Sequence, residues 1–162
     1  MAVSFCGVNA IAAAAQSADS TSAPPTTKVW LSLSLGPART EQTGQGLVAG
    51  QIALWGSRDR WAMAIRRSGG SDLDTRAEYD TALLFGLRTT PGPAMAIAAI
   101  GPTIVTNDPA GGPRSSAVGV GVAAELSLNL KYIGLGVSGF GALGSGHRFA
   151  GVGVTAELGV IR

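Results

Sequence analysis

The chain has 162 residues, of which 14% are charged and 24 are glycine, and its formal net charge is +2. Ordinary soluble domains contain about 25% charged residues and about 7% glycine, so this composition is unusual for a cytosolic enzyme. The small net charge does not indicate a nucleic-acid surface. No run of about 18 apolar residues is present, which excludes a transmembrane helix. A closed β-barrel is the other architecture that can cross a membrane, and the chain is long enough for one such domain.

The N-terminal residues differ in composition from the rest of the chain. Residues 1–15, MAVSFCGVNAIAAAA, form an apolar run that ends in small residues, as a secretory signal does. Because no Lys or Arg precedes the run, we expect either a signal peptide whose start lies upstream or a segment without an export role. Residues 16–27 are polar and lack a core pattern, which predicts a tether. The barrel domain is expected over residues 28–162.

From residue 28 onward, apolar residues alternate with small or polar ones, which is the period of a β-strand. Eight such segments are predicted: 28–36, 46–56, 60–67, 75–88, 94–105, 116–130, 132–142 and 147–161. The alternation is clearest in residues 117–130, where one face is apolar without interruption and the other is small, polar or charged. In the fifth segment, Gly101-Pro102 should force a bulge or a bend, because proline has no N–H for the ladder.

The connections between these segments alternate in length. Longer connections follow the first, third and fifth segments, a reduced one follows the seventh, and short connections lie between them. This pattern is typical of an up-and-down barrel with short turns at one rim and longer loops at the other. The predicted fold class is therefore all-β, an eight-stranded antiparallel up-and-down transmembrane β-barrel.

The polar face of the segments indicates which side of the barrel is inside. A soluble ligand-binding barrel would turn many charged side chains to water, whereas this face is mainly Gly, Ala and Ser, which suits the filled lumen of an eight-stranded barrel. Buried charges must pair, and we expect arginines of the third and fourth segments to reach Glu125 and Glu157. The predicted lumen charge network comprises Lys28, Arg60, Arg66, Arg76, Glu78, Asp80, Arg88, Glu125 and Glu157.

Aromatic residues cluster near the short-turn rim of the predicted barrel. Amphipathic rings collect at membrane–water interfaces, and the predicted interface aromatics are Trp30, Trp55, Trp61 and Tyr132. An alternative for inward-facing aromatics such as Trp30 and Phe140 is that they fill the space left by glycines on the last three segments.

The eight alternating segments, the alternating loop lengths and the export-like start resemble small Gram-negative outer-membrane barrels of the OmpA, OmpX and OmpW general type, over residues 28–162. The resemblance implies localisation in the bacterial outer membrane, with outer-membrane lipid and the barrel assembly machinery as partners. It also implies a structural or surface-interaction role, with a surface partner that the sequence does not identify. A narrow conduit for ions or small solutes is the alternative, and a soluble lipid-binding barrel is the third possibility.

Two patterns in the sequence are candidates for a catalytic or cofactor site. The stretch GFGALG (139–144) matches G-x-G-x-x-G, but a strand follows it where a dinucleotide site needs a helix. Ser145, His147 and Glu157 are all odd-numbered, so their side chains would lie on the same face of a strand. Twelve strand residues separate Ser145 from Glu157, which corresponds to about 40 Å. These residues therefore cannot form a hydrolytic trio. No Cys, His or carboxylate cluster has metal-ligand spacing. We therefore expect no enzymatic activity, cofactor, metal or nucleic-acid partner.

Overall fold

The computed structural model describes residues 27–40, 46–71, 77–89, 92–108, 113–145 and 147–160. The predicted signal peptide and tether lie outside the described residues, except Thr27, which begins the first strand. Within the described residues, no helix is long and apolar enough to cross a membrane.

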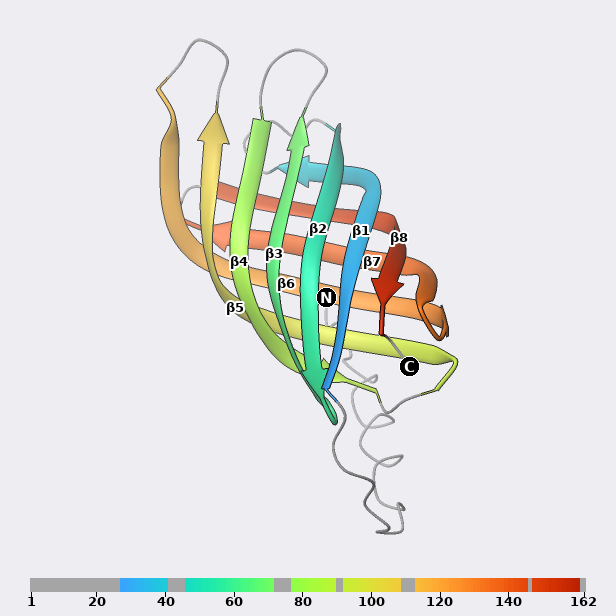
Figure 1. Cartoon of the computed structure of the whole chain (residues 1–162). Helices are drawn as coiled ribbons and strands as arrows, with labels where there is room; N and C mark the ends of the chain where they lie inside the picture. Colours follow the sequence, from blue (N-terminus) through green and yellow to red (C-terminus); the bar gives the residue numbers. More distant parts are fainter. Residues whose placement is uncertain are drawn as a thin grey trace, which may run out of the picture.

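Eight strands make up the fold. They are β1 (Thr27–Thr40), β2 (Gly46–Arg58), β3 (Trp61–Ser71), β4 (Ala77–Arg88), β5 (Ala94–Asp108), β6 (Ser115–Leu130), β7 (Ile133–Gly144) and β8 (His147–Gly159). Each strand pairs with the next one, and β8 pairs antiparallel with β1, so the sheet closes into a barrel. In Figure 1, β2, β3 and β4 run along one wall, and β6 and β7 cross behind them at a large angle. The prediction of an eight-stranded antiparallel up-and-down barrel is confirmed.

The strand register determines how steeply the strands are tilted. A path from Lys28 through successive paired residues around the barrel returns to β1 at Ala38, ten residues further along. The path passes through Ser57, Ala62, Gly86, Ala99, Ala123, Phe140 and Gly151. For eight strands, this stagger corresponds to a tilt of about 40° from the barrel axis.

The connections alternate in length less clearly than the sequence predicts. Residues 37–40 continue β1, so the first connection shrinks to residues 41–45 and equals in length the connection at 89–93. The tight turns after β2 and β6 each begin with a residue of positive φ, Asp59 at 54° and Lys131 at 40°. Left-handed residues are typical of tight hairpins, whose twist they match to that of the strands.

The ladder between β4 and β5 opens at Gly101-Pro102. The pairs that would join residues 83 and 84 to residues 101 and 102 are missing, while the pairs on either side keep the same register. A Cβ at Gly101 would collide with the carbonyl oxygen of Leu83, so the two backbones lie against each other. No extra residue is inserted, and the predicted irregularity is therefore a local opening of the ladder rather than a bulge.

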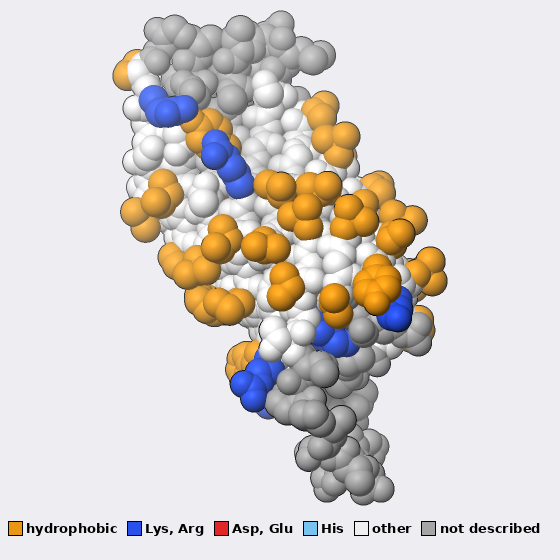
Figure 2. All heavy atoms as spheres, viewed as in Figure 1, with side chains coloured by type: hydrophobic (Ala, Val, Ile, Leu, Met, Phe, Trp, Pro, Cys, Tyr) orange, Lys and Arg blue, Asp and Glu red, His pale blue; other side chains and the backbone are white. Residues whose placement is uncertain are grey.

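Most large apolar side chains lie on the outside of the barrel, and most polar ones on the strands lie inside. On β6, Leu126 and Leu130 are 57% and 79% exposed, whereas Ser127 between them is 2% exposed. Figure 2 shows hydrophobic side chains over the middle of the outer wall, with Lys and Arg side chains toward its two ends. The predicted assignment of the two faces is therefore confirmed.

Candidate functional site in the barrel lumen

Most of the predicted lumen charges are buried inside the barrel: Lys28, Arg66, Glu78, Asp80, Arg88, Glu125 and Glu157. Arg76 lies outside the described residues. The prediction for Arg60 is wrong, because this residue is exposed in the turn before β3. Its guanidinium lies over the Trp61 ring, with Cζ 5.9 Å from the ring centroid. Since β3 begins one residue later than expected, Arg60 does not take part in the alternation of the strand.

The centre of the lumen is held by an ion pair between Arg66 on β3 and Asp80 on β4. Both side chains are fully buried. Asp80 also accepts hydrogen bonds from the Ser68 hydroxyl through Oδ1 and from Thr103 Oγ1, at 2.9 Å, through Oδ2. One carboxylate therefore joins three neighbouring strands, β3, β4 and β5.

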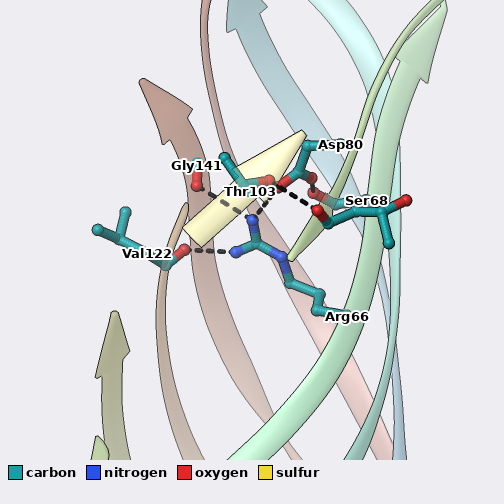
Figure 3. A network of polar contacts seen from close by, with 7 residues as sticks. Arg66, Ser68, Asp80, Thr103, Val122 and Gly141 are labelled. Atoms are coloured by element: carbon teal, nitrogen blue, oxygen red, sulfur yellow. Dashed lines mark hydrogen bonds and ion pairs between the residues drawn. The ribbon is translucent and has the colours of Figure 1, made fainter. Parts of the chain in front are cut away.

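The Arg66 guanidinium extends this network to the opposite wall of the barrel. Nη1 donates to the carbonyl oxygen of Val122 on β6, and Nη2 donates to that of Gly141 on β7 at 3.1 Å. Figure 3 shows the guanidinium between these carbonyls and the Asp80 carboxylate. Charge-assisted contacts of this kind are the strong class of hydrogen bonds, and here they connect β3 to β6 and β7 across the lumen.

Glu125 on β6 is held by neutral donors instead of an arginine. Its Oε1 accepts hydrogen bonds from Ser32 Oγ at 3.1 Å, Gln51 Nε2 at 3.0 Å and Trp55 Nε1 at 3.2 Å. These donors come from β1 and β2, so Glu125 links two distant parts of the wall.

The expectation that arginines of the third and fourth segments reach the two glutamates is wrong for Arg66 and Arg88, and Arg76 lies outside the described residues. Arg66 pairs with Asp80. Arg88 lies over the Trp30 ring, with Cζ 6.0 Å from the centroid, and its Nε donates to the carbonyl oxygen of Asp59 at 3.1 Å. The two arginines thus occupy different levels of the lumen.

Two of the four predicted interface aromatics are wrong. Trp30 and Trp55 are 1% and 0% exposed and stack on each other inside the barrel, with ring centroids 6.0 Å apart and planes 11° apart. Both have the inward parity of their strands, and parity decides the face however close a residue lies to a turn. Trp61 and Tyr132 are 62% and 54% exposed near the short-turn rim, and their place at a membrane interface stays a prediction.

Apolar side chains of two buried clusters share the lumen with the central ion pair. The stacked indoles belong to a buried cluster that also contains Leu84, Met95 and Ile97. A second cluster contains Phe140 and Phe149, whose ring centroids are 5.8 Å apart. A Cβ on Gly151 would come within 2.8 Å of the Phe140 ring. The glycine on β8 therefore makes room for an aromatic ring from the neighbouring strand β7, which is the alternative anticipated from the sequence.

The Ser145, His147 and Glu157 combination does not form a site. Ser145 is exposed in the turn after β7, whereas Glu157 is buried two residues before the opposite end of β8. Across the part of the chain that the structure describes, no group of three or more His, Cys, Asp and Glu side chains converges.

A closed eight-stranded barrel with a polar, filled interior and an apolar outer wall is the architecture of small outer-membrane barrel proteins. Neisserial surface protein A shares the fold, with a TM-score of 0.57 and 12% identity over 84% of this chain and 99% of that one. The N-terminal barrel domain of Pseudomonas aeruginosa OprF has a TM-score of 0.54 and 18% identity, over 82% and 100% of the two chains.

A third similar structure is Ail, the attachment invasion locus protein of Yersinia pestis, in complex with the heparin analogue sucrose octasulfate. Its TM-score is 0.58, with 8% identity over 82% of this chain and 97% of that one. No protein-family model matches the sequence. No curated protein matches it either. The similarity lies in the fold.

Proposed function

We propose that this protein spans the outer membrane of a Gram-negative bacterium as a closed barrel with a structural or surface-interaction role. The observation that carries the proposal is the inverted burial pattern. Large apolar side chains are exposed all around the wall, among them Leu35, Leu54, Ile65, Phe85, Ile100, Leu128, Leu135 and Val154. Soluble monomers rarely expose apolar patches larger than a few hundred Å², whereas lipid is the natural solvent for such a wall.

The height of the apolar wall matches a bilayer. On β6, the outward residues from Val118 to Leu130 are all apolar. At a tilt of about 40°, this stretch rises about 30 Å along the barrel axis, which is the thickness of a typical hydrocarbon core.

Rings paired with cations lie at both ends of this wall. At the short-turn rim, Lys131 Nζ lies 4.9 Å from the Tyr132 ring centroid in the turn after β6, and the Arg60–Trp61 pair lies at the turn after β2. Toward the other rim, Tyr79 on β4 lies between Arg67 and Arg114, whose Cζ atoms are 5.0 and 5.5 Å from its ring centroid. Long cationic and amphipathic aromatic side chains suit the membrane–water boundary, which supports a boundary at each end.

The contents of the lumen favour a closed barrel over the alternative of a conduit. The indole cluster, the Arg66–Asp80 ion pair and the Phe140–Phe149 pair are all buried in the interior. A soluble lipid-binding barrel is disfavoured by the apolar outer wall, because such a protein turns its polar face to water.

The proposed role at the cell surface is suggested by the names of two proteins with a similar fold. Neisserial surface protein A is named for its place on the cell surface, and Ail is named for attachment and invasion. Four points stay predictions for this chain: a surface partner, contact with outer-membrane lipid, insertion by the barrel assembly machinery and the lack of enzymatic activity.

Two measurements test the proposal. After expression with an export signal, the protein should fractionate with outer membranes and require detergent for extraction; recovery as a soluble monomer without detergent would refute the membrane placement. In planar bilayers, the purified protein should show no steady conductance. A steady, ion-selective conductance would instead establish the conduit.

A further inference from the structure

The lumen contains a group of buried oxygen atoms for which the described part of the chain provides no hydrogen bond of good geometry. They are Gln51 Oε1, Glu125 Oε2, Ser127 Oγ, Asn129 Oδ1, Glu157 Oε1 and Glu157 Oε2. Each of these side chains is at most 4% exposed. Buried polar atoms without partners are uncommon in folded proteins and cost free energy, so a group of six points to something that binds there.

Oxygens of β6 and β8 converge above a glycine of β7. Asn129 and Glu157 are the residues paired with Gly134 from its two sides. A Cβ on Gly134 would collide with both Asn129 Oδ1 and Glu157 Oε2. Because β7 has no side chain at this position, the amide oxygen and the carboxylate oxygen meet over the same backbone atom.

A second carboxylate and a hydroxyl lie beside this point. The side chains of Ser127 and Glu125 are the polar neighbours of the Glu157 carboxyl group. Oε1 of Glu125 already accepts three hydrogen bonds, whereas its Oε2 accepts none. Two adjacent carboxylates in a low-dielectric interior repel each other strongly, so a positive charge between them would be stabilising.

We propose that Glu125, Ser127, Asn129 and Glu157 bind a divalent cation of the calcium type inside the barrel. Two carboxylates balance two positive charges, and the amide and hydroxyl oxygens are hard neutral ligands. Calcium takes six to eight oxygen ligands in irregular geometry, whereas magnesium demands a near-ideal octahedron and zinc favours nitrogen and sulfur. The site lies near the rim that carries the termini, since Asn129 is the penultimate residue of β6.

Terbium luminescence tests the proposal on the full chain folded in detergent micelles. Tb³⁺ replaces Ca²⁺ at oxygen sites and emits when a nearby indole transfers energy to it. The Trp55 indole donates a hydrogen bond to Glu125 at 3.2 Å, so bound Tb³⁺ should emit on excitation of tryptophan. Ca²⁺ should displace it at much lower concentration than Mg²⁺, and Ca²⁺ should raise the Tm of the barrel.

Matched variants locate the ion. Glu157→Gln removes one ligand charge and should weaken Tb³⁺ and Ca²⁺ binding at least ~10-fold, whereas Glu78→Gln changes a buried acid at the other end of the lumen and should not. Trp55→Phe should reduce the sensitised emission, and Trp61→Phe should leave it unchanged.

The proposal is overturned if the unmodified protein gives no sensitised emission and no Ca²⁺-dependent Tm, because water alone then satisfies these oxygens. Equal binding by the Glu157→Gln and Glu78→Gln variants would overturn it as well. If Glu157→Gln does not fold, Ser127→Ala provides the second test, since it removes a ligand without changing the charge. All these measurements are independent of the location of the barrel in the cell.

Discussion

The Asp80→Ala substitution removes the acceptor at the centre of the lumen and leaves the Arg66 guanidinium without its carboxylate. Asp80 accepts from Arg66, Ser68 and Thr103. Thr103 retains a second acceptor, the carbonyl oxygen of Thr81 at 3.0 Å, so the loss of its bond is partly offset. The main cost is therefore that of a buried, unpaired cation.

The magnitude follows from the burial of the pair. Both side chains are 0% exposed, and removing one partner of a buried ion pair typically costs about 3–5 kcal/mol. Arg66 keeps its two backbone carbonyl acceptors, which moderates the penalty. We expect Asp80→Ala to lower the free energy of unfolding by about 4 kcal/mol.

Reversible urea unfolding in phospholipid vesicles, followed by tryptophan fluorescence, measures this free energy. The double variant Arg66→Met, Asp80→Ala removes both charges and should be about 1–3 kcal/mol more stable than the sum of the two single effects predicts. Ser145→Ala, in the exposed turn after β7, is the control and should change stability by less than about 0.5 kcal/mol. Strictly additive single effects would refute the idea that the pair acts as one unit.

Three other tests address the outer wall and the packing of the lumen. Val122→Arg should cost about 2–4 kcal/mol in vesicles because it places a charge at mid-height of the wall, whereas Leu130→Arg at the end of the same strand should cost about 0–1 kcal/mol; equal costs would contradict the membrane placement. Gly151→Ala should destabilise the barrel by about 1–3 kcal/mol through a clash with an aromatic ring. Gly139→Ala, with open space around it, should be neutral in the same urea titration, and a similar loss in both variants would show that packing is not the cause. Brominated lipid should quench the fluorescence of Trp61 and spare the stacked indole pair when each is studied in Trp→Phe variants; quenching of the stacked pair would argue against their place in the lumen.

Strand alternation was sufficient to predict which side chains face outward. The alternation of β6 predicts Leu126 outside and Ser127 inside, because successive side chains of a strand point to opposite faces. The same rule places Trp30 inside the barrel, because this residue shares its parity with Lys28 and Ser32. Closeness to a turn was the weaker signal, since it indicates height along the barrel and says nothing about the face.

Contacts across the lumen could not be predicted from the sequence, because they depend on the stagger between strands. Arg66 and Glu125 share the inward face, yet the register brings the guanidinium to Asp80 instead. The oxygen cluster was missed for a related reason. Metal-ligand spacing rules look for donors near one another in sequence, whereas Asn129 and Glu157 meet through the glycine between their strands.

The ten-residue stagger of this barrel raises the question of what selects it during folding. A slip of two residues at the seam between β1 and β8 would keep every apolar side chain on the outside, because facing repeats every two residues. The free energy of contact between the outer wall and lipid would therefore change little with such a slip. The interior contacts would change, however, since the slip would move Ser32 away from Glu157, its partner across the seam. The contacts between side chains inside the barrel thus select the native strand register. Registers shifted by two residues would lose these contacts, although their outer walls would be equally compatible with the membrane.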